Sequence, residues 1–386
     1  MMEAKQGLGT AKPRQIPWRR SALRELHMTL QHVEQYLSSL LQRPISVKSL
    51  TTLGQEPDEV RDKVFGYGTP IRVDYETTEG NRRSAVIHTI SPGPFGHEHM
   101  ADRAQILLWQ HKAFNHLPKH VRAVDVAGFQ ADQGLISLGK VQEFCLLTEY
   151  AAGEGYFCDL ERIRESGVAT TLDFARADAL CDYLAAIHRM PINDAGLYQR
   201  RIRELVGHGE CIMGLVDSYP LHPCITPAVL EEIEHRCVTW RWRLKSRAQR
   251  LRQVHGDFHP WNILFRDRVH FELLDRSRGE YGDPADDVTC LTANYMFFSL
   301  QRSGRLEGCI NDLFLRFWDR YLEKTADREM LNVVAPYFAF RCLVMASPVW
   351  YPNLPEIVRR RLIAFILAVL KSPSFDPREV NKYCGV

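Results

Sequence analysis

The sequence predicts an α+β protein in two parts, a β-rich part that ends near residue 150 and a helix-rich part that follows it. Three segments between residues 45 and 90 are rich in β-branched residues, and the turn signal Glu-Gly-Asn separates the last two. After residue 150, Leu and Ala recur at helical spacing over long segments. At 386 residues and 45% hydrophobic content, the chain is long enough to bury two cores.

The first part is expected to open with residues 1–20, whose Lys, Arg, Gly and Pro content predicts a mobile tail without the apolar core of a signal peptide. Residues 21–43 carry Leu and Val at the spacing of an amphipathic helix. Strands are predicted at residues 45–54, 70–80, 82–90, 121–129 and 143–150, with a helix at residues 97–117.

The second part begins after the segment "AAGEG" and is mainly helical, apart from a hairpin within residues 254–275. Residues 170–190 have Leu and Ala at i, i+3 and i+4, which predicts a helix. The apolar run at residues 362–370 is too short to span a bilayer and is expected to be a buried C-terminal helix. The predicted organisation is therefore a tail (1–20), a β-rich lobe (21–150) and a helical lobe (151–386).

Composition gives no reason to expect nucleic acid or a membrane as the main partner, since the formal charge is only +2. Ten scattered cysteines without a C-x-x-C pair are expected to be reduced thiols in a cytoplasmic protein. The sequence leaves the oligomeric state unknown.

The chemistry is concentrated in "VHGDFHPWNILFRDRVHFELLD", residues 254–275. Phosphoryl transfer needs a group that orients the attacking hydroxyl and accepts its proton, and oxygen ligands that hold Mg²⁺ on the phosphates. A loop with His255, Asp257 and Asn262, followed by a hairpin that ends at Asp275, supplies both. Each residue also has a local alternative: a core histidine, a turn or cap aspartate, or a polar hairpin asparagine.

The segments "HGDFHPWNILF" and "LLDRSRGEYGDPADDVTCL" together resemble the aminoglycoside phosphotransferase and choline kinase-like family. The resemblance implies that Asp257 is the catalytic base, that Asn262 and Asp275 bind Mg²⁺, and that His255 is a structural member of the catalytic loop. Asp287 would hold that loop from the following helix.

The resemblance also implies a bilobal protein-kinase-like fold whose small β-rich lobe binds nucleotide and whose helical lobe carries the catalytic loop and acceptor site. The implied reaction moves the γ-phosphoryl group of ATP, or GTP, to the hydroxyl of a small molecule. Backbone groups from Glu149 to Ala151 would meet the adenine, although this segment also fits an ordinary strand end. His188 is expected to be structural, and Asp283 a turn or N-cap residue.

The expected phosphate-binding Lys of the third strand is missing, because the alternation of "SAVIHTI" places His88 at its position. A protonated His88 could bind phosphate, since a nearby nucleotide raises its pKa. The alternatives are that Lys63, Arg83 or Arg103 reaches the phosphates, that the alignment is shifted, or that His88 is an ordinary strand residue.

Glu98 is expected to open the next helix. There its carboxylate would either pair with the phosphate-binding cation of the third strand or simply be stabilised by the helix dipole. "FGYGT", with Gly66 and Gly68, either folds over the phosphates or forms an ordinary turn.

The acceptor is expected to be neutral or anionic, because residues 189–250 hold ten Lys and Arg against seven Asp and Glu. These charges also fit a solvated helix face. The main alternative function is a catalytically degenerate kinase fold that binds a nucleotide or metabolite without turnover. A protein kinase or scaffold is disfavoured, since no A-P-E-type segment follows Asp275, and nothing in the sequence supports a hydrolase with a separate carboxylate pair.

Overall fold

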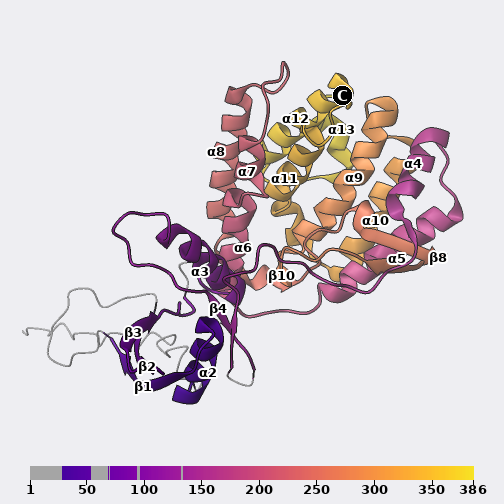
Figure 1. The fold of residues 1–386 in the computed structure, drawn as a ribbon. Helices are drawn as coiled ribbons and strands as arrows, with labels where there is room; N and C mark the ends of the chain where they lie inside the picture. Colours follow the sequence, from indigo (N-terminus) through magenta and orange to yellow (C-terminus); the bar gives the residue numbers. More distant parts are fainter. Residues whose placement is uncertain (1–27, 54–67, 69, 94–95, 132–133) are drawn as a thin grey trace, which may run out of the picture. The chain divides into compact units, whose positions relative to one another are not determined.

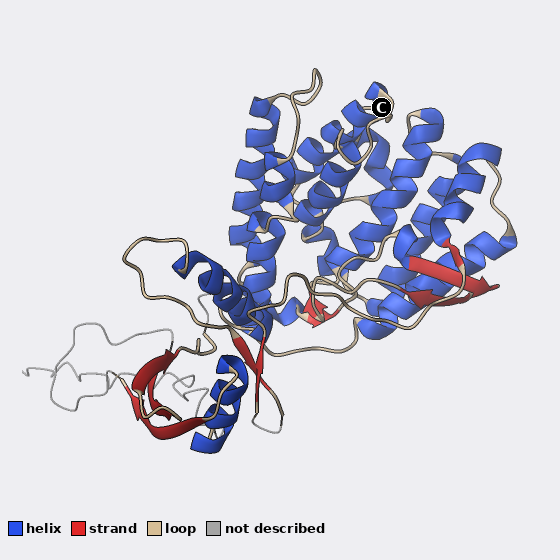
Figure 2. Cartoon of the chain, viewed as in Figure 1, coloured by secondary structure: helices blue, strands red, loops and turns tan. Residues whose placement is uncertain are grey.

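The computed structural model describes residues 28–53, 68, 70–93, 96–131 and 134–386. The chain forms two compact units, Met1–Leu147 and Thr148–Val386, which are considered separately below. Strands are prominent in the described residues of the first unit, and helices make up most of the second (Figures 1 and 2). The predicted α+β class, with a β-rich first part and a larger helical second part, is confirmed.

The first unit has a three-stranded antiparallel sheet in the order β1 (Ile45–Thr52), β2 (Ile71–Thr77) and β3 (Arg82–Ile87). Helix α2 (Leu30–Leu41) begins where the hydroxyl of its N-cap Thr29 accepts a hydrogen bond from the third helical backbone N–H. One face of α2 packs on β1, because apolar residues recur on that face. The buried residues of this small core are Val33, Leu37, Ile45, Val47 and Val73.

The first unit also contains α3 (Met100–Phe114) and a two-stranded ladder of β4 (Ala127–Phe129) and β5 (Leu135–Ser137). The strand predicted at residues 121–129 is therefore shortened. The strand predicted at residues 143–150 is wrong, since this segment is neither helix nor strand. Its side chains Phe144, Leu146 and Leu147 are exposed, and among the described residues no strand pairs with the segment. A β-branched and apolar pattern forms a strand only where another strand accepts its hydrogen bonds.

The second unit is built from helices that pack around one large core. Its α-helices are α4 (Tyr156–Ser166), α5 (Thr171–Ile187), α6 (Ala195–Gly207), α7 (Ile212–Asp217), α8 (Pro227–Leu244), α9 (Ala285–Ser303), α10 (Gly308–Thr325), α11 (Ala335–Ala346), α12 (Glu356–Lys371) and α13 (Val380–Tyr383). Short 3-10 helices are η1 (Ala248–Arg250), η2 (Pro260–Asn262), η3 (Arg328–Asn332) and η4 (Pro377–Glu379). Its strands are β6 (Glu154–Gly155), β7 (Arg252–Gln253), β8 (Ile263–Asp267), β9 (His270–Leu273) and β10 (Tyr281–Gly282).

Helix α9 is the centre of this core and contacts α4, α10 and α11. Its side chains are buried without interruption from Val288 to Leu300. The polar side chains among them donate hydrogen bonds to backbone carbonyls, which makes their burial possible: Thr289, Thr292, Asn294 and Ser299. The buried C-terminal helix predicted at residues 362–370 lies within α12 and is confirmed. Among the helices of the described residues, none combines the length and the apolar character that crossing a bilayer requires.

Candidate phosphoryl-transfer site

The loop between β7 and β8 is held by a buried carboxylate on the first turn of α9. The two oxygens of Asp287 accept the backbone N–H groups of His255 at 2.8 Å and Gly256 at 2.7 Å. Burial alone would raise the pKa of the Asp287 carboxyl, but the hydrogen bond and charge of His188 and the two backbone donors outweigh it and lower the pKa. The expected support of the loop by Asp287 is confirmed.

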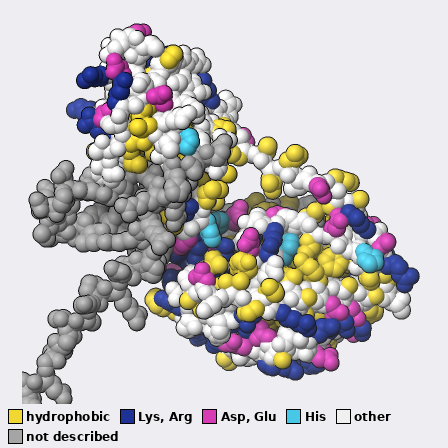
Figure 3. Space-filling model, turned by 90° about the horizontal axis from the view of Figure 1, so that it is seen from below, with side chains coloured by type: hydrophobic (Ala, Val, Ile, Leu, Met, Phe, Trp, Pro, Cys, Tyr) yellow, Lys and Arg dark blue, Asp and Glu magenta, His cyan; other side chains and the backbone are white. Residues whose placement is uncertain are grey.

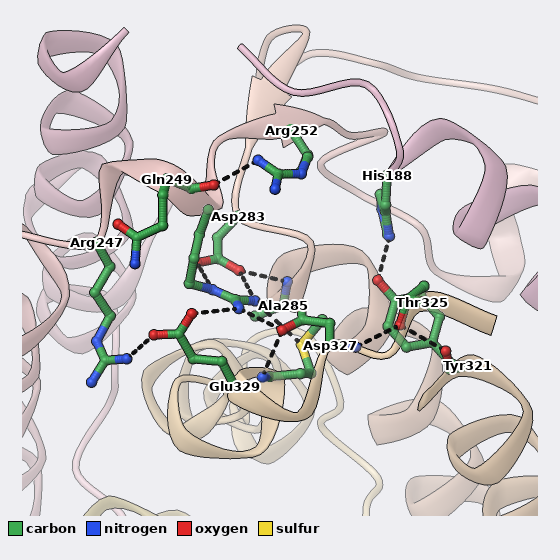
Figure 4. Close-up of polar contacts among 12 residues, drawn as sticks. His188, Arg247, Gln249, Arg252, Asp283, Ala285, Tyr321, Thr325, Asp327 and Glu329 are labelled. Atoms are coloured by element: carbon green, nitrogen blue, oxygen red, sulfur yellow. Dashed lines mark hydrogen bonds and ion pairs between the residues drawn. The ribbon is translucent and has the colours of Figure 1, made fainter. Parts of the chain in front are cut away.

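His188, at the C-terminus of α5, fixes the position of Asp287 from the other side. Its Nε2 lies 3.1 Å from Asp287 Oδ2, and its Nδ1 lies 2.7 Å from the hydroxyl of Tyr321 on α10. Figure 4 shows the contact between His188 and Tyr321. The imidazole therefore links α5 and α10 to the carboxylate that holds the loop. This is the structural role expected for His188.

A buried ion-pair network fixes the first turn of α9. The guanidinium group of Arg250 binds both oxygens of Asp283 at 2.9 Å and both oxygens of Asp327 at 2.9 and 3.0 Å. Each of the acidic residues Asp283, Asp327 and Glu329, which Figure 4 labels, forms an ion pair with Arg250. Asp283 also accepts the backbone N–H of Ala285, so it is a turn residue at the helix start, as expected.

His255 is buried and forms part of the loop itself. Its Nδ1 accepts the backbone N–H of Asp257 at 3.3 Å, and its ring packs edge-on against Phe258. Both contacts set the direction in which the backbone presents Asp257.

The hairpin of β8 and β9 brings Asn262 and Asp275 to the same end. Ile263 pairs with Leu273, and the backbone N–H of Leu274 donates to the carbonyl of Asn262 at 2.9 Å. Asp275 is the next residue, exposed and in the left-handed region with a φ of 50°. The Nδ2 of Asn262 donates to the carbonyl of Asp257 at 3.1 Å, so loop and hairpin are joined directly.

The donor set fits a magnesium ion that is bound together with nucleotide. Within the described residues, no group of three or more His, Cys, Asp or Glu side chains could hold a metal ion. Because the Nδ2 of Asn262 is engaged, its Oδ1 and the carboxylate of Asp275 are the oxygen ligands that remain. Mg²⁺ is commonly held by one or two protein carboxylates together with phosphate oxygens, and this set suits that mode.

The carboxylate of Asp257 has a cationic partner that the sequence analysis missed. Nη1 of Arg341, on α11, donates to Asp257 Oδ1 at 2.5 Å, and Nε2 of His259 lies 3.6 Å from Oδ2. Burial alone would raise the pKa of Asp257, but the charges of Arg341, His259 and Arg278 outweigh it, so the pKa lies below its ordinary value.

Arg341 is buried and also joins Asp257 to its surroundings. It donates to the carbonyl of Gly256 at 2.9 Å and to Asp286 Oδ1 at 2.5 Å. The signal for it in the sequence was its position as the single charged residue in the otherwise apolar segment "APYFAFRCLVMA". A lone charge in an apolar helix requires a buried partner.

Among the residues predicted in the first unit, His88 lies one residue beyond β3 and is exposed on the same face as Val86. No described residue forms a hydrogen bond or ion pair with its ring. Gly66 lies outside the described residues. Gly68 approaches the backbone so closely that a Cβ atom would lie 1.9 Å from the carbonyl oxygen of Thr89. Close packing therefore requires glycine at position 68.

The helix that follows β3 begins two residues after Glu98. Helix α3 begins at Met100 with His99 as its N-cap, because the side chain of Asp102 accepts the backbone N–H of His99 at 2.7 Å. The carbonyl of Glu98 accepts a hydrogen bond from Arg103. The expectation that Glu98 opens the helix is thus corrected by two residues.

The backbone from Glu149 to Ala151 was predicted to meet adenine, with an ordinary strand end as the alternative. These residues lie in the irregular segment that precedes β6, so the strand end is wrong. The structure therefore brings together His255, Asp257, Asn262 and Asp275 in the second unit. It places His88, Glu98 and Gly68 in the first.

Comparison with known proteins gives one family match. The model of the phosphotransferase enzyme family matches residues 96–323, more than half of the chain. No curated protein sequence matches the chain.

Several solved structures resemble the chain at low identity. A glucosamine kinase bound to glucosamine, ADP and inorganic phosphate is 21% identical with a TM-score of 0.36, over 52% of this chain and 56% of that one. An ADP-bound aminoglycoside phosphotransferase is 13% identical with a TM-score of 0.31, over 89% and 98%. A choline kinase from Streptococcus pneumoniae is 14% identical with a TM-score of 0.33, over 88% and 98%. The match to the first thus spans little more than half of the glucosamine kinase.

Proposed function

Because the chain belongs to the phosphotransferase enzyme family, we propose that it transfers the γ-phosphoryl group of ATP, or GTP, to the hydroxyl of a small molecule with the help of Mg²⁺. The observation that carries this proposal is the end of the β8–β9 hairpin. There Asn262 and Asp275 lie together, and Asn262 is hydrogen-bonded to the residue that bears the candidate base.

Asp257 is the proposed base that orients the acceptor hydroxyl and accepts its proton. Since Arg341 engages Oδ1, Oδ2 is the oxygen that would face the acceptor. The lowered pKa keeps the carboxylate ionised at neutral pH, as a proton acceptor must be. His255 and Asp287 position the backbone and take no part in proton transfer.

Asn262 Oδ1 and the Asp275 carboxylate would hold Mg²⁺ on the phosphates. When bound, the ion neutralises charge on the phosphate oxygens. The protein supplies rigidity, because the hydrogen bond from Leu274 to Asn262 fixes the distance between the two ligand-bearing backbones.

The remaining predicted residues complete the proposal, and all except Glu149 to Ala151 lie in the first unit. His88 would contact the phosphates in place of the usual Lys, with Glu98 as its carboxylate partner. Gly66 and Gly68 would cover the phosphates, and the backbone between Glu149 and Ala151 would meet the base of the nucleotide.

A second candidate function is nucleotide or metabolite binding without turnover. Two observations favour it. His88 stands at the position where the family resemblance leads us to expect Lys, and Arg341 donates a hydrogen bond to one carboxylate oxygen of the candidate base Asp257. Turnover by the purified chain would exclude this candidate.

Calorimetry of ATP binding with and without Mg²⁺ tests the nucleotide site. The Asp275→Asn variant should lose at least about tenfold in Mg²⁺-dependent affinity, because the metal loses a charged ligand. Asp267→Asn is the matched control, since Asp267 is an exposed residue at the opposite end of the same hairpin. Equal affinity of Asp275→Asn and the unmodified chain would contradict the ligand assignment.

Turnover of Asp257→Asn tests the base. We expect kcat to fall by about 10²–10⁴-fold, the range typical of general-base catalysis, while ATP binding stays unchanged. A parallel loss of ATP binding would instead assign Asp257 to the nucleotide site.

A further inference from the structure

Arg278 lies directly beside the loop that carries Asp257. Gly256 has a φ of 86°, and a Cβ atom added to it would meet the Cβ of Arg278 at 3.2 Å. The Arg278 guanidinium carbon lies 4.7 Å from the centre of the Phe340 ring, and that of Arg341 lies 4.6 Å from the same ring. The position of the Arg278 backbone and the stacking on Phe340 thus place a second guanidinium group near the candidate base Asp257.

The two arginines differ in how their charges are balanced. Arg341 forms ion pairs with Asp257 and with Asp286, both at 2.5 Å. For Arg278, no carboxylate of the described residues lies within ion-pair distance. Arg278 therefore has no carboxylate in direct contact, and it acts on Asp257 and Asp286 only at longer range.

The hydrogen bonds of Arg278 leave one edge of its guanidinium group unused. Nη1 donates to the sulfur of Cys211 at 3.1 Å, and Nε is buried without a partner. Burial raises the pKa of the Cys211 thiol to about 11, so the sulfur remains protonated and does not neutralise the arginine. The edge formed by Nε and Nη2 is the one that binds a carboxylate or phosphate through two parallel hydrogen bonds.

We propose that Arg278 binds an oxyanion, a carboxylate or a phosphate group, carried by the same small molecule whose hydroxyl is phosphorylated. This inference rests on the proposed function and narrows its substrate class to anionic alcohols. A partly buried guanidinium group that no carboxylate contacts is incompletely neutralised, and an anionic substrate would supply a directly bound counter-ion. A cationic acceptor would instead be repelled by Arg278.

The surrounding chain agrees with this charge preference. Residues 189–250, which include α6 to α8, carry ten basic and seven acidic residues. Arg201 on α6 approaches the backbone of Gly279, since a Cβ atom there would meet its Nη2. Arg201 is itself paired with Glu204 at 2.6 Å and donates to the carbonyl of Tyr281, so it supports this segment and adds no unpaired charge to it.

The test is a calorimetric titration of the full chain with inorganic phosphate and, separately, with acetate, after the nucleotide site is filled with Mg²⁺ and a non-hydrolysable ATP analogue. Arg278→Met removes the charge and retains an apolar stem against Phe340. Arg305→Met is the matched control, because Arg305 is exposed and pairs with Glu307 on the surface.

We expect at least one anion to bind the unmodified chain and Arg305→Met equally, and to bind Arg278→Met at least about tenfold more weakly. The tighter of the two anions distinguishes phosphate from carboxylate as the substrate group. Arg278→Lys keeps the charge but loses the bidentate fork, and we expect intermediate affinity. If Arg278→Met does not fold, judged by circular dichroism, Arg278→Lys decides the question.

The inference is overturned if neither anion binds the unmodified chain, if Arg278→Met binds as tightly as the control, or if choline binds in place of the anions. Failure of the proposed function is a separate result, namely no binding of the Mg²⁺-nucleotide. The anion titration is then repeated without the analogue and still reports on Arg278.

Discussion

Arg341 controls the charge state of the candidate base through one short contact. Its guanidinium group opposes the effect of burial on Asp257, so the carboxylate is deprotonated over a wider pH range. Base catalysis requires the deprotonated form, and activity is therefore lost as the pH falls through the pKa of Asp257.

Replacement of Arg341 by Gln should raise the pKa of Asp257, because burial is then opposed only by weaker charges. The acid limb of the pH profile of kcat/KM should move to higher pH. Arg341→Lys should shift it less, since one ammonium group retains a charge but cannot satisfy Asp257, Asp286 and the Gly256 carbonyl together. If the acid limb of the kcat/KM profile lies at the same pH in both variants as in the unmodified chain, Arg341 does not set the pKa of Asp257.

The sequence could identify Asp257, Asn262, Asp275 and Asp287 as candidate site residues because they lie in one continuous stretch, and their roles stay predictions. Arg341 follows Asp257 by 84 residues, and no local spacing relates the two. Arg278 was within the quoted stretch, but its importance depends on which carboxylates lie near it. Contacts between distant segments require the packing of α11, which periodicity does not specify.

At the scale of secondary-structure elements, the start of α9 depends on the network around Arg250. Asp283 is buried, and it is held by Arg250, by the hydroxyl of Tyr198 at 3.0 Å and by the backbone of Ala285. Removal of the arginine would leave a buried carboxylate without its cation.

We therefore expect Arg250→Met to reduce the free energy of unfolding by about 3–5 kcal/mol, the cost of breaking a buried ion pair from one side. Urea unfolding followed by circular dichroism measures this change. The control is Arg328→Met on η3, which is exposed and should change stability by less than about 0.5 kcal/mol. Equal midpoints for the two variants would show that the network does not stabilise α9.

The hairpin of β8 and β9 was predicted correctly because its strands and turn are adjacent in sequence. The segment at residues 143–150 has a similar apolar and β-branched content but forms no strand. Periodicity reveals which residues could pair and does not reveal whether a free sheet edge is present. Elements that need a distant partner are thus the ones that the sequence predicted least well.

For the whole molecule, the α+β class and the family resemblance were predicted correctly, and the family match confirms the resemblance. The assignment of nucleotide to the first unit and of acceptor to the second stays a prediction. Basic and acidic side chains are mixed over the face of the second unit in Figure 3, in keeping with a net charge of only +2.

The two units should differ in local stability, because their buried cores differ greatly in size. Each fully buried aliphatic side chain contributes about 1.5–3 kcal/mol, and the first unit buries few of them in its described residues. Hydrogen exchange of the full chain should show slow exchange in α9 and faster exchange in β1 to β3. Equal protection in the two regions would indicate one cooperative unit.

The hydrogen bond from Leu274 to Asn262 has a thermodynamic consequence for the metal. Asn262 directly precedes β8 and Asp275 follows β9, so opening of the hairpin would move the two candidate ligands apart. On the proposed function, metal binding and hairpin closure would be linked equilibria, and each would favour the other by the same free energy. On the proposed function, the turn that includes Arg268, with a φ of 34°, would influence metal affinity without any contact with the ion.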